Sequence, residues 1–449
     1  MVERTHVRVA AAVVFLVCAS VVGGAYASQS TPTVRGAADG DGRIEPTNGT
    51  TVIATDSNTW LGKESDGPRA NAELVAFGPD GRTIYYNDSH TRYWDVDPVE
   101  GTNATVEYLY ADHLTPEECG GETACTRNGI ERVNLTTGEV EDIYSRVTPG
   151  KHSTRWHDGD RLNDTSYVVA DIAADRVFVV NTTSELVTWS WDAQSAFDPA
   201  ETGGPFPEDW THLNDVEVLS NGHIQVSLRN HDRVVYLDRE TGLVESQTLG
   251  NGSHDVVYEQ HNPDYIENAD GDNATLVADS ENNRLVEYRR HNGEWSQSWV
   301  WQDETLQWPR DADRLPNGHT LVTDSNGNRV LELDETGNVV WSVPIAFPYE
   351  AERLETGDES TGGQPAHELP LENQTVGAEA GDESSAVAAA IPNPVLNAVY
   401  YVLPRWMGLS TLATALFGGI VALGWVALEI RWLPYSISIT NPFSIYRRR

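Results

Sequence analysis

The sequence predicts an all-β protein, a β-propeller of about six four-stranded blades, with an apolar segment near each end. Three observations lead to this prediction: a repeated strand motif, Asn-Gly turns between short alternating strands, and little helical spacing between the two apolar segments. The chain has 449 residues, which exceeds a usual domain of roughly 100 to 200 residues. It therefore contains two domains or one repeat architecture, and the repeats favour the second.

The repeated motif is a strand that begins with an arginine. Residues 283–288 (Asn-Arg-Leu-Val-Glu-Tyr) and 328–333 (Asn-Arg-Val-Leu-Glu-Leu) align without gaps, with Arg284 and Arg329 45 positions apart. Similar segments lie at 232–237, 175–180, 131–135 and, in degenerate form, 73–77. These copies give the expected number of about six blades.

Two hairpins per repeat account for four strands per blade. Residues 215–223 and 311–319 each place an Asn-Gly turn between two strands, and residues 335–341 show apolar alternation after a glycine-containing turn. A propeller closes such sheets into a ring, in which the first and last repeats are expected to share a blade. A pair of β-sandwiches is the alternative, but it would not require a recurrent motif.

Both apolar segments are expected to direct the chain to a membrane. Residues 1–28 have the pattern of a signal peptide or signal anchor, ending in the small-x-small run Ala25-Tyr26-Ala27. Residues 406–430 are uncharged up to Leu428, which is long enough to cross a hydrocarbon layer of about 30 Å. The arginines that follow this span place residues 431–449 in the cytoplasm by the positive-inside rule.

The expected domain order follows from these boundaries. The bulk of the chain is predicted to be extracellular, on a cell-membrane protein that crosses once or twice. Gly, Glu, Ser, Thr and Ala dominate the stretch before the last span, which is typical of a flexible acidic linker. The predicted parts are 1–28 signal peptide or anchor, 45–350 propeller ectodomain, 351–390 linker, 406–430 transmembrane helix and 431–449 cytoplasmic tail.

The charge balance is strongly acidic. Asp and Glu number 68 against 30 Lys and Arg, a formal net charge of -38, which argues against binding to nucleic acid or anionic lipid surfaces. Only Lys63 and Lys151 are lysines. Hydrated carboxylates keep a protein soluble where concentrated salt screens their repulsion, so we expect a halophilic protein that partly unfolds at low salt.

Cysteines and sequons fit an exported chain. Cys119 and Cys125 are expected to form a loop-pinning disulfide, because no further ligands stand at zinc-site spacing. Nine Asn-x-Ser/Thr sequons are compatible with a glycoprotein. They lie at Asn48, Asn87, Asn103, Asn134, Asn163, Asn181, Asn251, Asn273 and Asn373.

Polar residues recur where the repeats begin, and in a propeller these positions approach the central channel. The candidates are His157, His212, His254 and Arg310, each next to or near an aspartate. Their convergence from separate blades would form a site, although such residues also tie blades together through buried hydrogen bonds. Arg229 ends an inner strand 17 positions after His212 and is a candidate anion ligand.

Residues 209–215 (Asp-Trp-Thr-His-Leu-Asn-Asp), 225–229 (Gln-Val-Ser-Leu-Arg) and 234–242 resemble the arylsulfate sulfotransferase family. The resemblance extends over roughly residues 45 to 345, through His254 and Arg310. It implies an exported propeller enzyme that moves a sulfuryl group from a phenolic sulfate to a phenol or hydroxyl acceptor. The family does so through a covalent sulfohistidine, without a nucleotide donor.

The resemblance also implies roles for the candidate residues. His212 and His254, in either order, would be the nucleophile and its proton-transfer partner, with His157 as a weaker third member. Arg229 and Arg310 would hold the sulfuryl oxygens, and Asn214 belongs to the substrate-binding set.

No metal and no cofactor are expected. Residues 270–273 (Asp-Gly-Asp-Asn) look like part of a calcium loop but lack the downstream glutamate. The alternative function is a non-catalytic propeller that binds a surface glycan or an envelope protein. A lyase or a quinone-dependent dehydrogenase is a weaker possibility, and the sequence does not indicate an oligomeric state.

Overall fold

The computed structural model describes residues 4–28, 43–56, 72–121, 123–150, 155–375, 391–404, 406–433, 435–438 and 444–447. The chain divides into two compact units. One unit is Thr31–Val402, and the other combines Met1–Ser30 with Leu403–Arg449.

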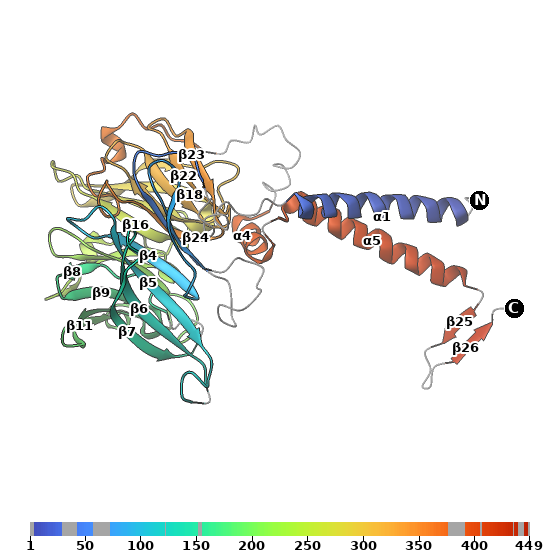
Figure 1. The fold of residues 1–449 in the computed structure, drawn as a ribbon, viewed down its shortest axis with the longest axis horizontal. Coiled ribbons are helices and arrows are strands. Elements are labelled where there is room, and N and C mark those ends of the chain that lie inside the picture. The colour runs from blue at the N-terminus through green and yellow to red at the C-terminus, as the bar shows by residue number, and fades with distance from the viewer. Residues whose placement is uncertain are drawn as a thin grey trace. The chain divides into compact units, whose positions relative to one another are not determined.

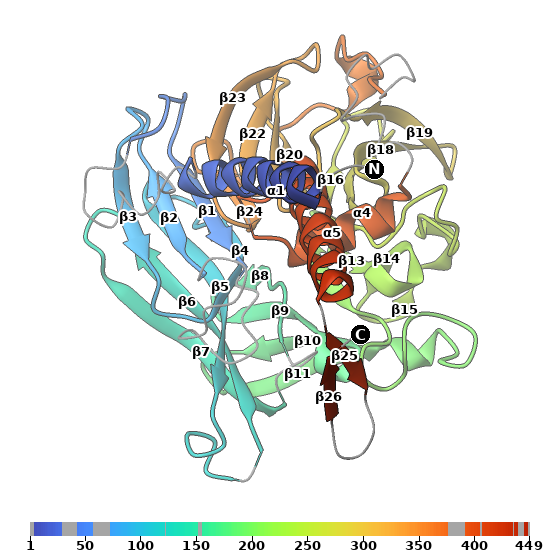
Figure 2. The same cartoon turned by 90° about the vertical axis from the view of Figure 1, so that its right-hand side faces the viewer.

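The larger unit is a ring of six four-stranded antiparallel sheets, which confirms the predicted β-propeller (Figures 1 and 2). The first three sheets, each in spatial order, are β24 (Pro348–Arg353), β1 (Thr51–Thr55), β2 (Leu74–Phe77) and β3 (Thr83–Asn87); β4 (Arg92–Pro98), β5 (Thr105–Leu114), β6 (Cys125–Asn134) and β7 (Val140–Pro149); β8 (Arg161–Asn163), β9 (Ser166–Asp171), β10 (Arg176–Asn181) and β11 (Leu186–Asp192).

The remaining sheets follow the same order from the innermost strand outward. They are β12 (Leu213–Val218), β13 (Ile224–Leu228), β14 (Arg233–Asp238) and β15 (Gly242–Leu243); β16 (His261–Ile266), β17 (Ala274–Asp279), β18 (Arg284–His291) and β19 (Glu294–Trp301); β20 (Pro309–Arg314), β21 (Thr320–Asp324), β22 (Arg329–Leu333) and β23 (Val339–Pro344). Single 3-10 turns are η1 (Ile172–Ala174), η2 (Ala193–Ser195), η3 (Arg229–His231), η4 (Glu245–Gln247), η5 (Ser280–Asn282) and η6 (Ala366–Glu368).

The ring closes between the two ends of the propeller sequence. β24 pairs antiparallel with β1, with Val52 opposite Glu352, so the first and last repeats share a blade as predicted. This pairing leaves no open edge between the ends of the ring.

Strand position within a blade explains the residue pattern. Strand β17 (Ala-Thr-Leu-Val-Ala-Asp) is buried along its whole length because it packs between neighbouring blades. The outermost strand β23 instead buries only Trp341 and Val343, since its other face meets solvent. Clusters of apolar side chains join one blade to the next, such as Val177 with Val216 and Leu276 with Leu331.

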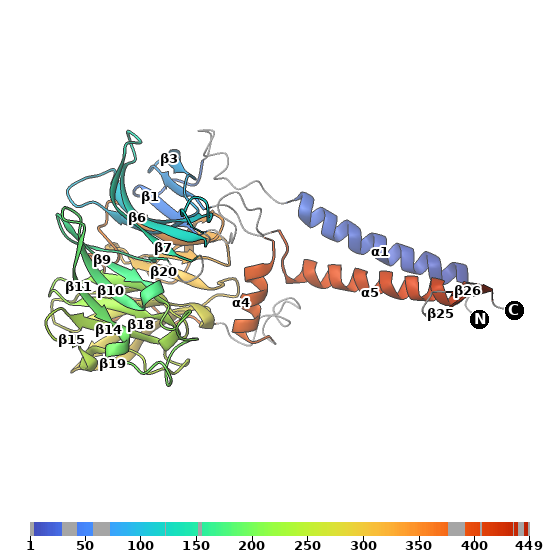
Figure 3. The same cartoon turned by 90° about the horizontal axis from the view of Figure 1, so that it is seen from below.

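Two further features complete the propeller unit. Cys119 and Cys125 are joined by a disulfide, with Cα atoms 6.0 Å apart. Helix α4 (Asn393–Val402) lies against one face of the ring (Figures 1 and 3). The described structure continues past β24 to residue 375, within the segment expected to be a linker, whereas residues 376–390 of that segment lie outside the described residues.

The smaller unit contains two helices that are long and apolar enough to cross a membrane, α1 (Arg4–Ala27) and α5 (Leu409–Trp432). They pack against each other in antiparallel orientation: Arg8 pairs with Glu429, and Tyr26 contacts Trp406. A hairpin of β25 (Tyr435–Ser438) and β26 (Ser444–Arg447) follows α5.

Candidate functional site

A cavity of about 300 Å³ lies where the inner strands of the propeller begin, and α4 lines part of it. Its polar wall contains three histidines and four arginines. These are His157, His212, His261, Arg92, Arg155, Arg229 and Arg310. Polar side chains from separate blades therefore converge as expected, although the set of residues differs in part from the predicted one.

One position of the repeat supplies most of this wall. Each blade has a buried acid on or next to its innermost strand, and the residue three positions earlier faces the cavity in five of the six blades. Those five residues are Arg92, Arg155, His212, His261 and Trp308, which precede Asp95, Asp158, Asp215, Asp264 and Asp311. Phe347 occupies the sixth position, before Glu350. Equivalent positions of successive repeats thus lie next to one another around the cavity.

His212 is held in place from two directions. Its backbone has a φ of 44°, a left-handed conformation that is uncommon outside glycine, and Asp175 of the preceding blade fixes the adjacent Thr211 by hydrogen bonds. The Nδ1 atom lies 2.7 Å from Asp209 Oδ1. With the Nδ1 proton donated to this carboxylate, the Nε2 lone pair is available to a substrate.

The protonation of this pair follows from its surroundings. Burial and the charge of Arg229 lower the pKa of His212 to about 4, although Asp209 opposes them. Burial raises the pKa of Asp209, but the hydrogen bond and charge of His212 outweigh it and lower that pKa to about 2. At neutral pH the pair is therefore a neutral imidazole beside a carboxylate.

The other two imidazoles are also neutral. Burial and neighbouring cations lower the pKa of His157 and of His261 well below the ordinary value. His261 Nδ1 lies 2.8 Å from Ser280 Oγ and 3.2 Å from the Glu259 carbonyl oxygen, so this nitrogen donates its proton and Nε2 carries the lone pair. His157 Nδ1 lies 3.0 Å from Tyr349 Oη, and its ring stacks on Trp94.

The arginines differ in how much of their charge is already neutralised. Arg92 and Arg310 share Asp56, and Arg229 pairs with Glu259. Among the described residues, Arg155 has no carboxylate partner, and its guanidinium lies 5.4 Å from the centre of the Trp94 ring. Burial and the charge of Arg92 lower the pKa of Arg155 to about 10, so it stays protonated at neutral pH. It is therefore free to bind an anion.

Aromatic rings and α4 form the rest of the wall. Trp94, Trp308 and Tyr401 line the cavity, and the Trp308 and Tyr401 rings meet edge to face with centroids 5.8 Å apart. Tyr401 lies on α4, which is fastened to the propeller because Asn397 donates to Glu281 Oε2 at 3.0 Å. The cavity thus combines a cationic side with an aromatic side.

Four of the six predicted site residues line this cavity, namely His157, His212, Arg229 and Arg310. His254 does not: its side chain is 58% exposed, its ring stacks on Tyr258, and its Nε2 atom lies 3.3 Å from Asp232 Oδ2. Asn214 is fully buried and donates to the Gln260 carbonyl oxygen, so it supports the strand start without lining the cavity.

His261 takes the place expected for His254. The His-Asp pair at 254–255 was the predicted repeat start, but the inner strand of this blade begins at His261. Once the structure identifies Asp264 as the buried acid of this blade, counting back three residues, as from Asp215 to His212, leads to His261. The same count identifies Arg92 and Arg155. Asp209 lay inside the quoted 209–215 motif but was given no role.

Part of the chain matches a known protein family. Residues 153–346 match the family model described as Arylsulfotransferase (ASST). The predicted resemblance to arylsulfotransferases is confirmed over this segment. The matched segment includes every cavity histidine and Arg155, Arg229 and Arg310, whereas Arg92, Trp94 and α4 lie outside it.

The solved structures to which the chain is similar are distant in sequence, and no curated protein matches the chain. A protein of unknown function from Bacteroides caccae is 10% identical, with a TM-score of 0.44, over 68% of this chain and 98% of that one. A periplasmic gluconolactonase of Pseudomonas aeruginosa is 14% identical, with a TM-score of 0.42, over the same two shares. A catalytically inactive virginiamycin B lyase from Staphylococcus aureus is 9% identical, with a TM-score of 0.39, over 69% and 88%.

Proposed function

We propose that the protein is an arylsulfotransferase that moves a sulfuryl group from a phenolic sulfate donor to a phenol or hydroxyl acceptor. The observation that carries the proposal is the cavity itself, where neutral imidazoles face an arginine without a carboxylate partner among the described residues. The family match over residues 153–346 supports the same chemistry.

The sulfate group and the aryl ring of the donor contact different sides of the cavity. The sulfate group, with one negative charge, lies against Arg155, and Arg229 and Arg310 add donors as charge shifts toward the oxygens. The aryl ring packs against Trp308 and Tyr401, because aromatic rings favour edge-to-face and offset contacts. The cavity of about 300 Å³ is of the size class that holds small ligands.

His261 is the nucleophile in this account. Its Nε2 lone pair attacks sulfur, the sulfur–oxygen bond to the aryl group breaks, and the aryl oxygen leaves with the electron pair as a phenolate. The products are a sulfohistidine and a phenolate, so charge and atoms balance without a further reactant. Ser280 and the Glu259 carbonyl favour this role because they accept the Nδ1 proton and leave Nε2 unprotonated.

His212 transfers the proton. In the second half-reaction its Nε2 atom takes the proton of the acceptor hydroxyl, whose oxygen then attacks sulfur and releases His261. The resulting imidazolium is stabilised by Asp209, as in other histidine–carboxylate pairs, and returns its proton to the departed phenolate or to water. This assignment keeps the two roles predicted from the sequence and moves one of them from His254 to His261.

Turnover tests the proposal directly. The full chain in detergent should release a chromogenic phenol from its sulfate ester, faster when a second phenol is present as acceptor. Sulfation of that acceptor should match the release, which separates transfer from hydrolysis. The alternative, a propeller that only binds a glycan or an envelope protein, is supported instead if the folded protein retains sulfated ligands and cleaves none of several donors.

We also propose that α1 and α5 anchor the protein as an antiparallel pair, with the propeller outside the cell. Arg4 and Arg8 lie near Trp432 and Glu429, so the charged ends of both helices meet at one side, as the positive-inside rule requires of a cytoplasmic end. A retained α1 is consistent with this packing. Intact mass of the membrane-extracted protein tests it, because cleavage after Ala27 would remove α1.

The acidic surface and the sequons complete the proposal. A net charge of -38 suits a halophilic extracellular protein, and the circular dichroism of the folded chain should change on desalting. Glycan occupancy is testable by mass spectrometry at sequons such as Asn103 and Asn163.

A further inference from the structure

The innermost strands of the propeller carry buried carboxylates around its axis, a region called the tunnel below. Every blade contributes one acid at the repeat position described above: Asp95, Asp158, Asp215, Asp264, Asp311 and Glu350, each at most 3% exposed. Five blades add a second acid two residues later, at Asp97, Asp160, Glu217, Asp313 and Glu352. Tyr349 connects this region to the cavity, because its hydroxyl lies 3.0 Å from His157 Nδ1 and its ring contacts Arg310, while the next residue is Glu350.

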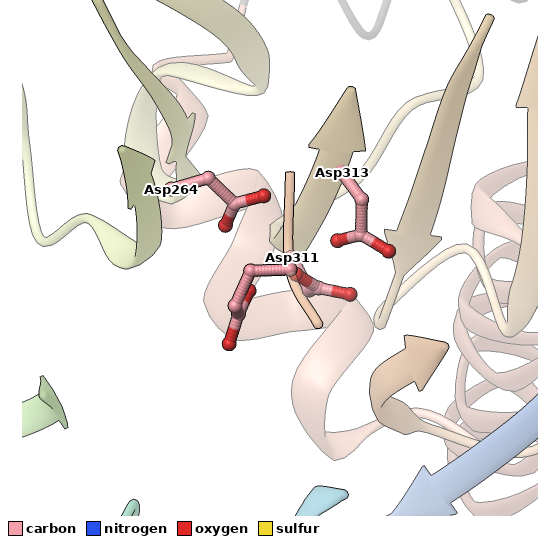
Figure 4. Close-up of side chains that lie close together, drawn as sticks. Asp264, Asp311 and Asp313 are labelled. Carbon is pink, nitrogen blue, oxygen red and sulfur yellow. The ribbon is translucent and has the colours of Figure 1, made fainter. Parts of the chain in front are cut away.

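Three of these acids and one acid from a neighbouring segment lie close together. Asp264 of β16, Asp311 and Asp313 of β20, and Glu359 of the segment after β24 each place a carboxylate oxygen within 4.8 Å of the others. Figure 4 shows the three aspartates approaching one another from the two strands. Two oxygens on opposite sides of a calcium ion would be separated by roughly twice its usual ligand distance of 2.3–2.6 Å.

Hydrogen bonds hold one side of the cluster and leave oxygens free on the other. Ser360 Oγ donates to Asp264 Oδ2 at 2.5 Å, and Thr323 Oγ1 and the Ala351 N–H donate to Asp311 Oδ2, both at 3.2 Å. The second oxygens, Asp264 Oδ1 and Asp311 Oδ1, are buried, and no donor among the residues that the structure describes reaches them.

The surroundings of Asp313 provide a second indication that a ligand binds at this cluster. Asp313 is 1% exposed, and within the described part of the chain no N–H or hydroxyl donor reaches either of its carboxylate oxygens, whose close neighbour is the carboxyl group of Asp311. Among the ion pairs of the described residues, none involves these four acids; the neighbouring Arg314 donates to Glu287 instead. An uncompensated buried carboxylate is costly, so a group of four requires protons or a cation.

We infer that Asp264, Asp311, Asp313 and Glu359 bind a divalent cation of the calcium type in the tunnel. The donor set contains only oxygen, which suits a hard cation, and the ligands come from strands and a loop and not from one rigid cage, which suits calcium better than the smaller magnesium. The ion fastens the β16 and β20 blades to the segment after β24, close to the point where the ring closes. This site is separate from the proposed sulfuryl-transfer cavity, and it differs from the expectation of no metal.

Calcium-dependent stability tests the inference. The full chain in detergent and constant molar potassium chloride is treated with a chelator, and its melting temperature is measured with and without added calcium. Saturating calcium should raise the melting temperature by about 5 °C in the wild type. Asp313→Asn should abolish most of this rise. Asp270→Asn, in the exposed loop that looks like a calcium motif, is the matched control and should keep the full rise.

Folding of the variants is checked separately. Asp313→Asn removes a buried charge, so its melting temperature in chelator should equal or exceed that of the wild type. Glu359→Gln alters a ligand outside the blades and should also lose the calcium response, together with bound calcium measured by isothermal titration. An unchanged wild-type melting temperature in calcium overturns the inference, as does an equal response in Asp313→Asn. Stabilisation by mild acid alone would then show that the carboxylates share protons.

Discussion

His212 Nδ1 lies 2.7 Å from Asp209 Oδ1, three residues earlier in the chain, in a cavity where every histidine is neutral. This contact fixes which nitrogen of His212 carries the proton and directs the other toward substrate. It also provides a carboxylate to stabilise the imidazolium formed when an acceptor is deprotonated. The pair is therefore the structural basis of the proposed proton transfer.

Replacing Asp209 should impair turnover more than folding. In Asp209→Asn the imidazolium loses its counter-charge, and we expect kcat to fall roughly 100-fold or more. Steady-state release of a chromogenic phenol measures the effect. Glu208→Gln, an exposed neighbour, is the matched control and should behave as the wild type. A kcat of Asp209→Asn close to that of the control would show that the pair has no part in proton transfer.

The pH dependence of kcat/KM for the acceptor should reflect the lowered pKa of His212, because this histidine acts in the second half-reaction. This histidine acts as a base only when neutral, and its pKa of about 4 lies below the ordinary 6.5. Activity should therefore persist as pH falls through 6.5 and decline only near pH 4, if the propeller stays folded there. Circular dichroism at each pH verifies folding. A decline centred near pH 6.5 would contradict the assigned environment of His212.

Arg155 should determine the affinity for the sulfated donor. Removing a charged donor without another partner costs substrate binding, so Arg155→Gln should raise KM for the aryl sulfate by about 10- to 100-fold. The acceptor KM should change much less. Arg146→Gln removes an exposed arginine nearby in sequence and controls for the loss of one positive charge. Equal donor KM values in both variants would show that Arg155 does not bind the sulfated donor.

His90 gives a prediction about stability alone. Burial disfavours its charge, but hydrogen bonds to Asp112 and Glu131, both at 3.1 Å, outweigh burial and raise the pKa of His90 to about 9. Because the folded pKa lies above the unfolded value of 6.5, this stabilisation is complete below pH 6.5 and is lost as pH rises toward 9. After allowance for solvent screening it is on the order of 2 kcal/mol.

His90→Gln should flatten this dependence. Chemical denaturation at several pH values between 6.5 and 9 measures the free energy of unfolding of both proteins. His291→Gln, which removes an exposed histidine paired with Asp272, is the control and should retain the wild-type slope. A wild-type slope in His90→Gln would assign the pH dependence to other groups.

The sequence predicts the propeller because its repeat is visible locally: apolar alternation and Asn-Gly turns identify hairpins, and the arginine-led strand marks each copy. It also predicts Arg229, because that arginine ends a recognisable inner strand. His261 could not be placed by a neighbouring motif. A longer turn through residues 267–273 stands where the β12–β13 and β20–β21 hairpins have an Asn-Gly turn, so the position of the inner strand had to come from its pairing with β17.

Other parts of the site depend on contacts that no local pattern contains. Whether Arg155 has a carboxylate partner depends on where Asp56 and Glu259 lie in other blades. Asp56 forms its ion pairs with Arg92 and Arg310. Tyr401 lies in residues 391–405, to which the sequence assigned no part, and α4 brings it to the cavity. The ring of buried acids could not be predicted from the sequence, since burial around the propeller axis results from closure of the ring and is not visible in any one repeat.

Trapping the covalent intermediate tests the central claim most directly. The full chain is mixed with an aryl sulfate and no acceptor, and its intact mass is recorded, followed by peptide mapping. The account predicts a gain of one sulfuryl group on His261 in the wild type and in His254→Ala, its loss when phenol is added, and no gain in His261→Ala. In His212→Ala the group should form but be discharged slowly. A wild type that releases phenol without any mass gain, or a gain that persists in His261→Ala, would contradict transfer through His261.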